Sequence, residues 1–149
     1  MTEDDIERKL VSDIEEFGWH VIKIFEDDEG PAFAYSIGLF KSFSHAEVIV
    51  FGLDVNLMHR MINLIGEEVL QGRRFADGDP ASGILEGYDV RFLNVASRHY
   101  HEHVGYARWF YKGDDFPLLQ CIWPDMQGRF PTDAGFARAL RPRQPLLDQ

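Results

Sequence analysis

The sequence predicts a single α+β domain in which a mainly antiparallel sheet is flanked by about three helices. The sheet could be curled into a half-barrel. Two observations carry this prediction. Short apolar segments are joined mostly by turn-like stretches, and strands do not alternate regularly with helices as they would in a doubly wound parallel sheet. The 149 residues are 45% hydrophobic and show no shift of composition, so residues 1–149 should form one domain, with an irregular tail over about 131–149.

Helical periodicity marks three segments. In residues 3–17 an apolar side chain recurs at every third or fourth position, Thr2 can cap the first turn, and Gly18 can end the helix. The same spacing predicts helices over residues 55–70 and 98–112. These three helices are expected to cover the faces of the sheet.

The strand-like segments are short and rich in branched and aromatic side chains. They cover residues 19–25, 33–39, 48–53, 84–85, 90–95 and 118–123. The first two are separated by the turn signal EDDEGP and should form a hairpin, with residues 41–45 and 77–83 as loops. The run VIVFGL is apolar throughout, which is typical of a central strand buried on both faces. One face of the second strand carries only small residues, so either a helix of this chain or a flat ligand could approach it.

The charge of the chain restricts its partners. The formal net charge is −10, which argues against binding nucleic acid through its phosphates and against adsorption to anionic membranes. An acidic surface would instead attract a basic protein at long range. The single cysteine, Cys121, cannot form an internal disulfide, and the acidic N-terminus lacks the pattern of a signal peptide. We therefore expect a cytoplasmic protein.

Three segments together resemble the bacterial domain-of-unknown-function 4262 family. They are FAYSIGL followed by HAEVIVFGL, the helix of residues 99–111 before Phe116, and QCIWPDMQGRFP. The family's patterns there are similar to "aYSiGL…hPElivfGL" and "QlvWPDxxGrfPW". Ala46 and Thr132 depart from the usual proline and tryptophan. The resemblance implies a fold and a set of positions, but no activity.

Histidines at positions 99, 101 and 103 form the first candidate site. On a helix, His99 and His103 are neighbours four residues apart, a spacing that can chelate a metal. Tyr106 continues the same face and would add an aromatic wall. A catalytic metal would need a third ligand from elsewhere in the fold, so a polar rim of a helix or cleft is the simpler interpretation.

The segment WPDMQGRFP is the second candidate. Its proline, aspartate and glycine favour a tight turn held by aromatic residues. The alternative is a polar site in which Asp125 and Arg129 lie beside the Trp123 ring.

The sequence thus predicts a binding surface but assigns no catalytic residue. The candidates for contact with a ligand or partner are Tyr35, His45, Glu47, His99, His103, Tyr106, Trp123, Asp125 and Arg129. The phosphate-binding and nucleophile motifs GxxxxGK[ST], GxGxxG and GxSxG do not occur. We expect a small acidic interaction protein, of toxin-neutralising (immunity-like) or accessory type, whose partner is a protein or a small molecule. Two alternatives stay open: a flavin-binding oxidoreductase of split-barrel type, and a metal-dependent hydrolase using His99 and His103. The oligomeric state is left open.

Overall fold

The computed structural model describes residues 2–149 and contains one six-stranded sheet. The strands are β1 (His20–Ile24), β2 (Phe33–Ile37), β3 (Glu47–Phe51), β4 (Pro80–Leu85), β5 (Tyr88–Asn94) and β6 (Leu118–Ile122). Their spatial order is β1-β2-β3-β6-β5-β4, and every neighbouring pair is antiparallel except β3 and β6. The predicted α+β class is confirmed. The sheet is open and does not close into a barrel.

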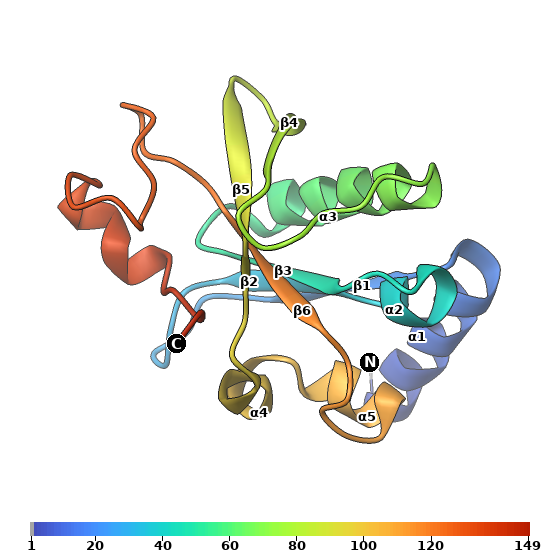
Figure 1. Ribbon diagram of the computed structural model, residues 1–149. Helices are drawn as coiled ribbons and strands as arrows, with labels where there is room; N and C mark the ends of the chain where they lie inside the picture. The colour runs from blue at the N-terminus through green and yellow to red at the C-terminus, as the bar shows by residue number, and fades with distance from the viewer. Residues whose placement is uncertain (1) are drawn as a thin grey trace.

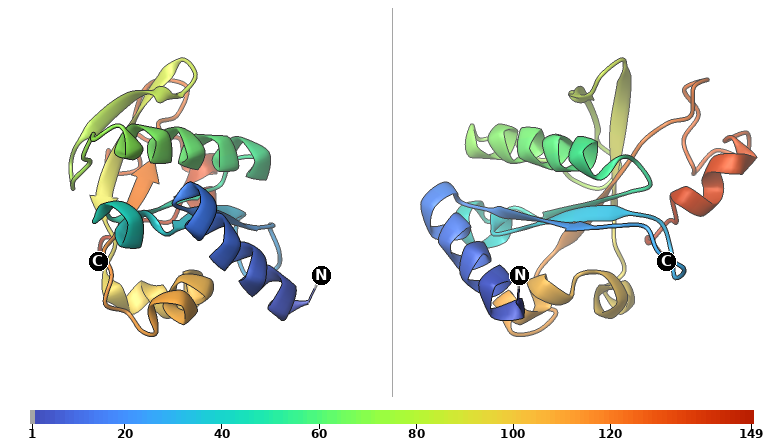
Figure 2. Two further views of the ribbon diagram at one scale, coloured as in Figure 1. Left: turned by 90° about the vertical axis from the view of Figure 1, so that its right-hand side faces the viewer. Right: turned by 180° about the vertical axis from the view of Figure 1, so that it is seen from behind.

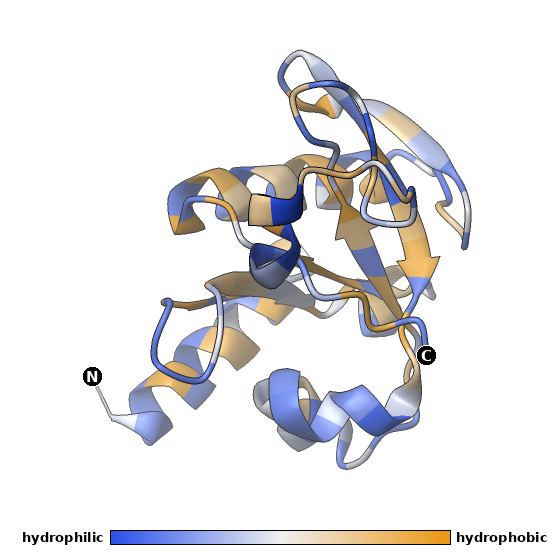
Figure 3. Ribbon diagram, turned by 90° about the vertical axis from the view of Figure 1, so that its left-hand side faces the viewer, coloured by the Kyte–Doolittle hydropathy of each residue, from blue (hydrophilic) through white to orange (hydrophobic). Residues whose placement is uncertain are grey.

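Helices cover both faces of this sheet. They are α1 (Glu3–Phe17), α2 (Leu39–Phe43), α3 (Val55–Leu70), α4 (Tyr100–His103) and α5 (Gly105–Tyr111), with short 3₁₀ turns η1 (Ser97–His99) and η2 (Arg138–Arg143). Figure 1 shows α3 above the sheet and α1, α4 and α5 below it. Each layer buries its own core, one centred on α3 and one on α1, α4 and α5. Figure 3 shows hydrophobic residues concentrated on the central strands, whereas α1 carries both kinds.

The helices predicted over residues 3–17 and 55–70 are confirmed with those bounds. Thr2 and Asp5 cap the first turn of α1 reciprocally, and Gly18 ends the helix in the left-handed conformation. The third prediction was wrong in one respect, because residues 98–112 do not form one helix. The backbone at buried Val104 is not helical (φ −118°, ψ 49°), which separates α4 from α5.

Two loops of the prediction also differ. The second strand ends at Ile37, and residues expected to form a loop make the short helix α2. Gly38 makes this change of direction possible: its φ is +119°, and a β-carbon there would lie 2.6 Å from the Gly18 carbonyl oxygen. The loop predicted over residues 77–83 already contains the start of β4 at Pro80.

The segment after residue 130 is irregular but attached to the sheet. The buried side chain of Gln120 donates to the Pro145 carbonyl at 2.7 Å and accepts from the Leu147 N–H at 3.0 Å. Gln144 makes the reciprocal pair with the backbone of Trp123, at 2.8 and 3.0 Å. Two glutamines therefore tie the end of the chain to β6. None of the helices within residues 2–149 has the length and apolar character needed to cross a membrane.

Candidate functional site

Glu47 is the centre of a buried polar network. Its carboxylate has no exposed surface and lies where β3 begins, opposite the turn from β2 into α2. Oε1 accepts from the Ser36 hydroxyl at 2.8 Å and from the Leu39 N–H at 3.2 Å. Oε2 accepts from the N–H groups of Gly38 and Phe40, at 2.9 and 3.2 Å, and from the Tyr111 hydroxyl. The five donors satisfy both oxygens, so Glu47 fixes the first turn of α2 and attaches α5 to it.

The protonation of this network follows from its burial. Burial raises the pKa of Glu47, while hydrogen bonds from Tyr111 and Ser36 oppose that rise. Burial and the neighbouring Glu47 charge raise the pKa of Tyr111, so the phenol stays protonated and keeps donating. Every donor around Glu47 already has a partner inside the protein, and this supports a structural role for the network.

Tyr35, Tyr106 and His103 are brought together on the α4–α5 face of the sheet. The buried Tyr35 hydroxyl accepts from the Tyr106 N–H at 3.2 Å. The His103 ring lies edge-on against Phe33 and Phe51, with centroid distances of 5.4 and 5.2 Å. Burial lowers the pKa of His103, which favours the neutral ring. This group is an aromatic contact between a helix and the sheet.

His99 does not join His103 on one helix. It belongs to η1, and its Nε2 lies 2.7 Å from the Gln149 carbonyl oxygen at the end of the chain. Among residues 2–149 no group of three or more His, Cys, Asp or Glu side chains is arranged to hold a metal ion. Within the described residues, no third side chain joins His99 and His103 as a metal ligand.

His45 lies on the other side of the sheet, against Phe75. Its Nδ1 donates to the Ala46 carbonyl at 2.8 Å, and its Nε2 accepts from the Phe75 N–H at 3.0 Å. A ring that both donates and accepts is neutral. Burial lowers the pKa of His45, in agreement with that state.

Asp125 organises the turn between β6 and the C-terminal segment. Its carboxylate accepts from the N–H groups of Gln127, Arg129 and Ala137 at 2.9–3.0 Å, and from the Arg129 guanidinium at 3.2 Å. Burial alone would raise the pKa of Asp125, but the backbone N–H groups and the Arg129 charge hold it below its usual value. The buried Trp123 indole donates to the Phe51 carbonyl at 2.6 Å.

The predicted site residues therefore occupy several separate places. Tyr35, His103 and Tyr106 share one cluster, and Asp125, Arg129 and Trp123 belong to the C-terminal turn. His45 packs under the α3 layer, whereas Glu47 lies inside the sheet. The small residues of β2 face the α3 core, in which Ala34 is buried. Cys121 is fully buried in β6, and burial raises the pKa of its thiol to about 12.

A groove of about 930 Å³ runs along the edge strand β1, between α1 and α3. The right-hand view of Figure 2 shows β1 between these two helices, with α3 above and α1 below. Three of the largest exposed apolar side chains line the groove: Phe17, Phe25 and Leu70, which are 60%, 67% and 52% exposed. An apolar surface is thus open to solvent next to a sheet edge.

Two helices form fixed walls of this groove. On the α3 side, the Trp19 indole donates to Asn63 Oδ1 at 3.0 Å and lies against Gly66, where a β-carbon would come within 2.6 Å of the ring. On the α1 side, Asp13 accepts from Lys9 at 2.8 Å and pairs with His20 Nδ1 at 2.7 Å. These contacts hold α1 and α3 on either side of β1.

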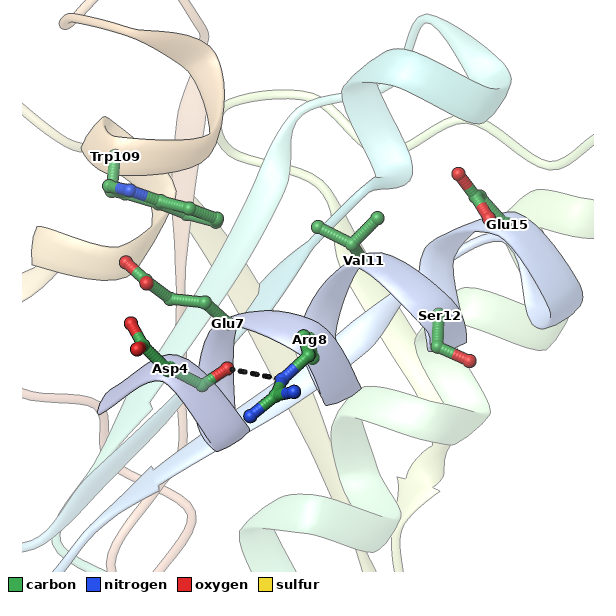
Figure 4. Close-up of a pocket in the computed structure, with 7 residues that line it drawn as sticks. All are labelled: Asp4, Glu7, Arg8, Val11, Ser12, Glu15 and Trp109. Carbon is green, nitrogen blue, oxygen red and sulfur yellow. Dashed lines mark hydrogen bonds between the residues drawn. The ribbon is translucent and has the colours of Figure 1, made fainter. Parts of the chain in front are cut away.

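A second hollow, of about 630 Å³, lies on the opposite side of α1. Figure 4 shows the Trp109 ring from α5 facing the carboxylate of Glu7, with Asp4 and Arg8 beside it. The Arg8 Nε donates to the Asp4 carbonyl at 3.4 Å. Trp109 is 46% exposed, so an aromatic face borders the acidic surface of α1.

The groove at β1 was not predicted, and of the predicted site residues only Tyr106 lines it. Phe17 fits the apolar stripe of its helix, yet the structure exposes it. Phe25 stands directly before the acidic turn, and this position at the end of a strand could have indicated that its side chain is exposed. The missing information was that β1 is an edge strand, because edge position depends on how all six strands assemble.

A family model described as "Domain of unknown function (DUF4262)" matches residues 13–137. The chain belongs to this family. The DUF4262 match begins inside α1 and extends past the Asp125 turn, so it contains every strand of the sheet. No curated protein and no solved structure is similar enough to the chain to be matched. The DUF4262 description assigns no activity to the family.

Proposed function

We propose that this DUF4262 chain is a binding protein that engages a basic protein partner through the edge of the molecule formed by α1, β1 and the turn after β1. The distribution of charge carries this proposal. Residues 1–30 contain eleven acidic and three basic side chains, whereas residues 124–149 contain three acidic and four basic ones. Most of the net negative charge is therefore carried by the edge of the molecule that α1, β1 and the following turn form. Such a field steers a positively charged partner to that edge.

Exposed aromatic side chains along the same edge support the proposal. Phe17 and Phe25 border the groove, and Trp109 faces the acidic side of α1. Large aromatic residues supply much of the binding energy in protein interfaces, and charged residues around them add specificity. A basic side chain could also lie on the Trp109 face while it pairs with a carboxylate. A protein that neutralises a basic toxin, or an accessory subunit of a basic partner, would use such a surface.

The satisfied interior supports binding over catalysis. Glu47, His45 and Asp125 have the residue types of acid–base chemistry, but their polar atoms are hydrogen-bonded to the protein itself. Their role in holding α2, the residue 75 region and the C-terminal turn accounts for those contacts.

The proposal is tested by affinity capture from cells of the source organism with three baits. The acidic-end variant carries Glu15→Gln, Glu16→Gln, Glu26→Gln and Glu29→Gln. The control variant removes the same number of exposed charges elsewhere, through Glu86→Gln, Asp89→Asn, Asp115→Asn and Asp148→Asn. A partner recovered by the wild-type and control baits is then purified and titrated at several salt concentrations.

The expected result is a basic protein whose capture is lost with the acidic-end variant alone. Its affinity should fall steeply as salt rises, because screening weakens the attraction. An acidic partner, or a partner captured equally by all three baits, would contradict the proposal.

A further inference from the structure

We infer that the β1 edge binds an extended apolar segment of that partner by strand addition, with lysine or arginine residues flanking the segment. This inference rests on the proposed function and names the structure that the partner presents. The added strand would extend the sheet from six strands to seven, with α1 and α3 on either side of it.

The direction of the backbone groups in β2 follows from its pairing with β3. The Gly52 N–H donates to the Ala32 carbonyl at 2.8 Å, so the backbone of Ala32 faces β3. Successive residues of a strand direct their N–H and C=O groups to opposite sides. Phe33 and Tyr35 therefore direct theirs toward β1.

The register then shows which residues of β1 are unpaired. Phe33 lies opposite Ile24, and Tyr35 lies opposite Ile22, so these two isoleucines form the ladder with β2. The alternate residues, Val21 and Lys23, direct their backbone N–H and C=O groups away from the sheet. Within residues 2–149 these outward groups have no hydrogen-bond partner. Lys23 is exposed and Val21, 9% exposed, lines the groove, so these unpaired groups would meet an added strand inside the groove.

The other edge of the sheet lacks this regularity. β4 begins at Pro80, which has no N–H, and its register against β5 shifts between Ala81 and Leu85. Proline and bulges are common devices that protect an edge from pairing. β1 pairs with β2 in unbroken register from His20 to Ile24 and contains neither device. Of the two edges of the sheet, the β1 edge has the more regular backbone for accepting a strand.

The walls of the groove suit an alternating apolar segment. Val21 packs into the core under α3, whereas Ile22 packs into the core on the α1 side. Side chains of an added strand would follow the same alternation. Those on one face would contact the α3 wall near Leu70, and those on the other would contact the α1 wall near Phe17.

Negative charge at the two ends of β1 favours basic residues at both ends of the bound segment. Glu15 and Glu16 are exposed just before the strand, and four acidic residues, 26–29, follow it. Basic residues at both ends of the bound segment would pair with these groups. A second copy of the chain fits poorly, because antiparallel pairing of two β1 strands would bring residues 26–29 of one copy beside Glu15 and Glu16 of the other.

The test uses a displayed library of random peptides of about twelve residues, long enough to pass β1 and both acidic flanks. The tightest selected peptide is titrated against four proteins: wild type, the acidic-end variant, Lys23→Pro and Lys23→Ala. Lys23→Pro removes the outward N–H of an exposed edge residue, which an edge strand tolerates. Lys23→Ala removes the same side chain but keeps the N–H.

Strand addition predicts selected peptides that alternate apolar residues between basic ends. It also predicts binding at least tenfold weaker for Lys23→Pro, and within about threefold of wild type for Lys23→Ala. If Lys23→Pro does not fold, amide exchange in the wild type decides: the Val21 and Lys23 amides must slow at least tenfold when the peptide is added.

The contrary outcomes separate the two proposals. Equal binding by folded Lys23→Pro and Lys23→Ala, with loss only in the acidic-end variant, would overturn strand addition and leave the proposed function standing. Strand addition would also be overturned if the library yielded no alternating peptide with basic ends. It would be overturned as well if sedimentation equilibrium showed a dimer formed through β1. Binding insensitive to the acidic-end variant would count against the proposed function.

Discussion

The buried network around Glu47 and the edge strand β1 differ in how their polar groups are hydrogen-bonded. Around Glu47 five donors meet two carboxylate oxygens, and no side-chain polar atom buried within residues 2–149 lacks a partner. At β1 the outward backbone groups of exposed Lys23 and of Val21, which is 9% exposed, line the groove beside exposed Phe17 and Phe25. A polar residue that is fully satisfied inside the protein stabilises the scaffold. Binding capacity lies where hydrogen-bonding groups and apolar side chains are left open.

The largest effect on stability is expected for Glu47→Ala. The substitution leaves a cavity and removes the acceptor for five donors, so we expect a loss of at least about 3 kcal/mol in the free energy of unfolding. Urea denaturation followed by circular dichroism measures it. The matched control is Glu86→Ala, an exposed carboxylate on the β4–β5 turn, which should change stability by less than about 0.5 kcal/mol. Equal losses of stability in the two variants would contradict a stabilising role for the buried Glu47 network.

A smaller effect is expected for Tyr111→Phe. The phenylalanine keeps the ring contacts with Phe40 and Phe116 but removes the donor to Glu47 and the acceptor of the Lys41 N–H. We expect a loss of about 1–2 kcal/mol in the same measurement. The double variant with Glu47→Ala should lose less than the sum of the two, because both changes remove one interaction. Simple additivity would show that the two groups are not coupled.

A pH effect is expected from His45. Burial lowers the pKa of His45 in the folded state. As the pH falls, the unfolded chain therefore binds a proton at this histidine at a higher pH than the folded protein does. Its contribution to stability is therefore complete above about pH 6.5 and is lost as the pH falls below that value, by at most about 1.4 kcal/mol per pH unit. His45→Gln should flatten the fall in stability between about pH 6.5 and 5, whereas substitution of exposed His101 should not. A His45→Gln profile parallel to that of the wild type would contradict the neutral buried ring.

The smallest effect on stability is expected at the edge. Phe17→Ser and Phe25→Ser alter exposed side chains and should each change the free energy of unfolding by less than about 0.5 kcal/mol. Both should nevertheless weaken binding of the selected peptide, by about tenfold or more for an anchoring aromatic residue. Met126→Ser is the control, since this exposed residue lies on the turn after β6. Unchanged peptide binding in both phenylalanine variants would show that the groove is not the contact surface.

Local features of the fold were predictable where local chemistry decides them. Helices α1 and α3 follow from their apolar periodicity and caps, and the VIVF part of VIVFGL is buried in the sheet as expected, whereas β3 ends at Phe51. The break at Val104 was missed: this residue fits the apolar spacing of a helix, yet its backbone is not helical where it is buried in the core on the α1 side of the sheet. The start of α2 was missed for a similar reason: its first turn is capped by Glu47 from β3 rather than by a neighbouring residue.

The candidate site was less predictable than the fold. Residue type alone marked Glu47, His45 and Asp125, but it could not show that their partners are the protein's own N–H groups. The β1 edge was the converse case. Its residues are ordinary for a strand, and their exposure results from the order of strands in the sheet.

Amide hydrogen exchange along β1 tests the central claim most directly. In the free protein, the outward amides of Val21 and Lys23 should exchange rapidly, while the amide of Ile22, paired with β2, should be protected. Adding the selected basic-flanked peptide should protect Val21 and Lys23 at least tenfold and leave Ile22 unchanged. Protection of both outward amides in the free protein, or no change on addition of a bound peptide, would contradict an open edge that binds by strand addition.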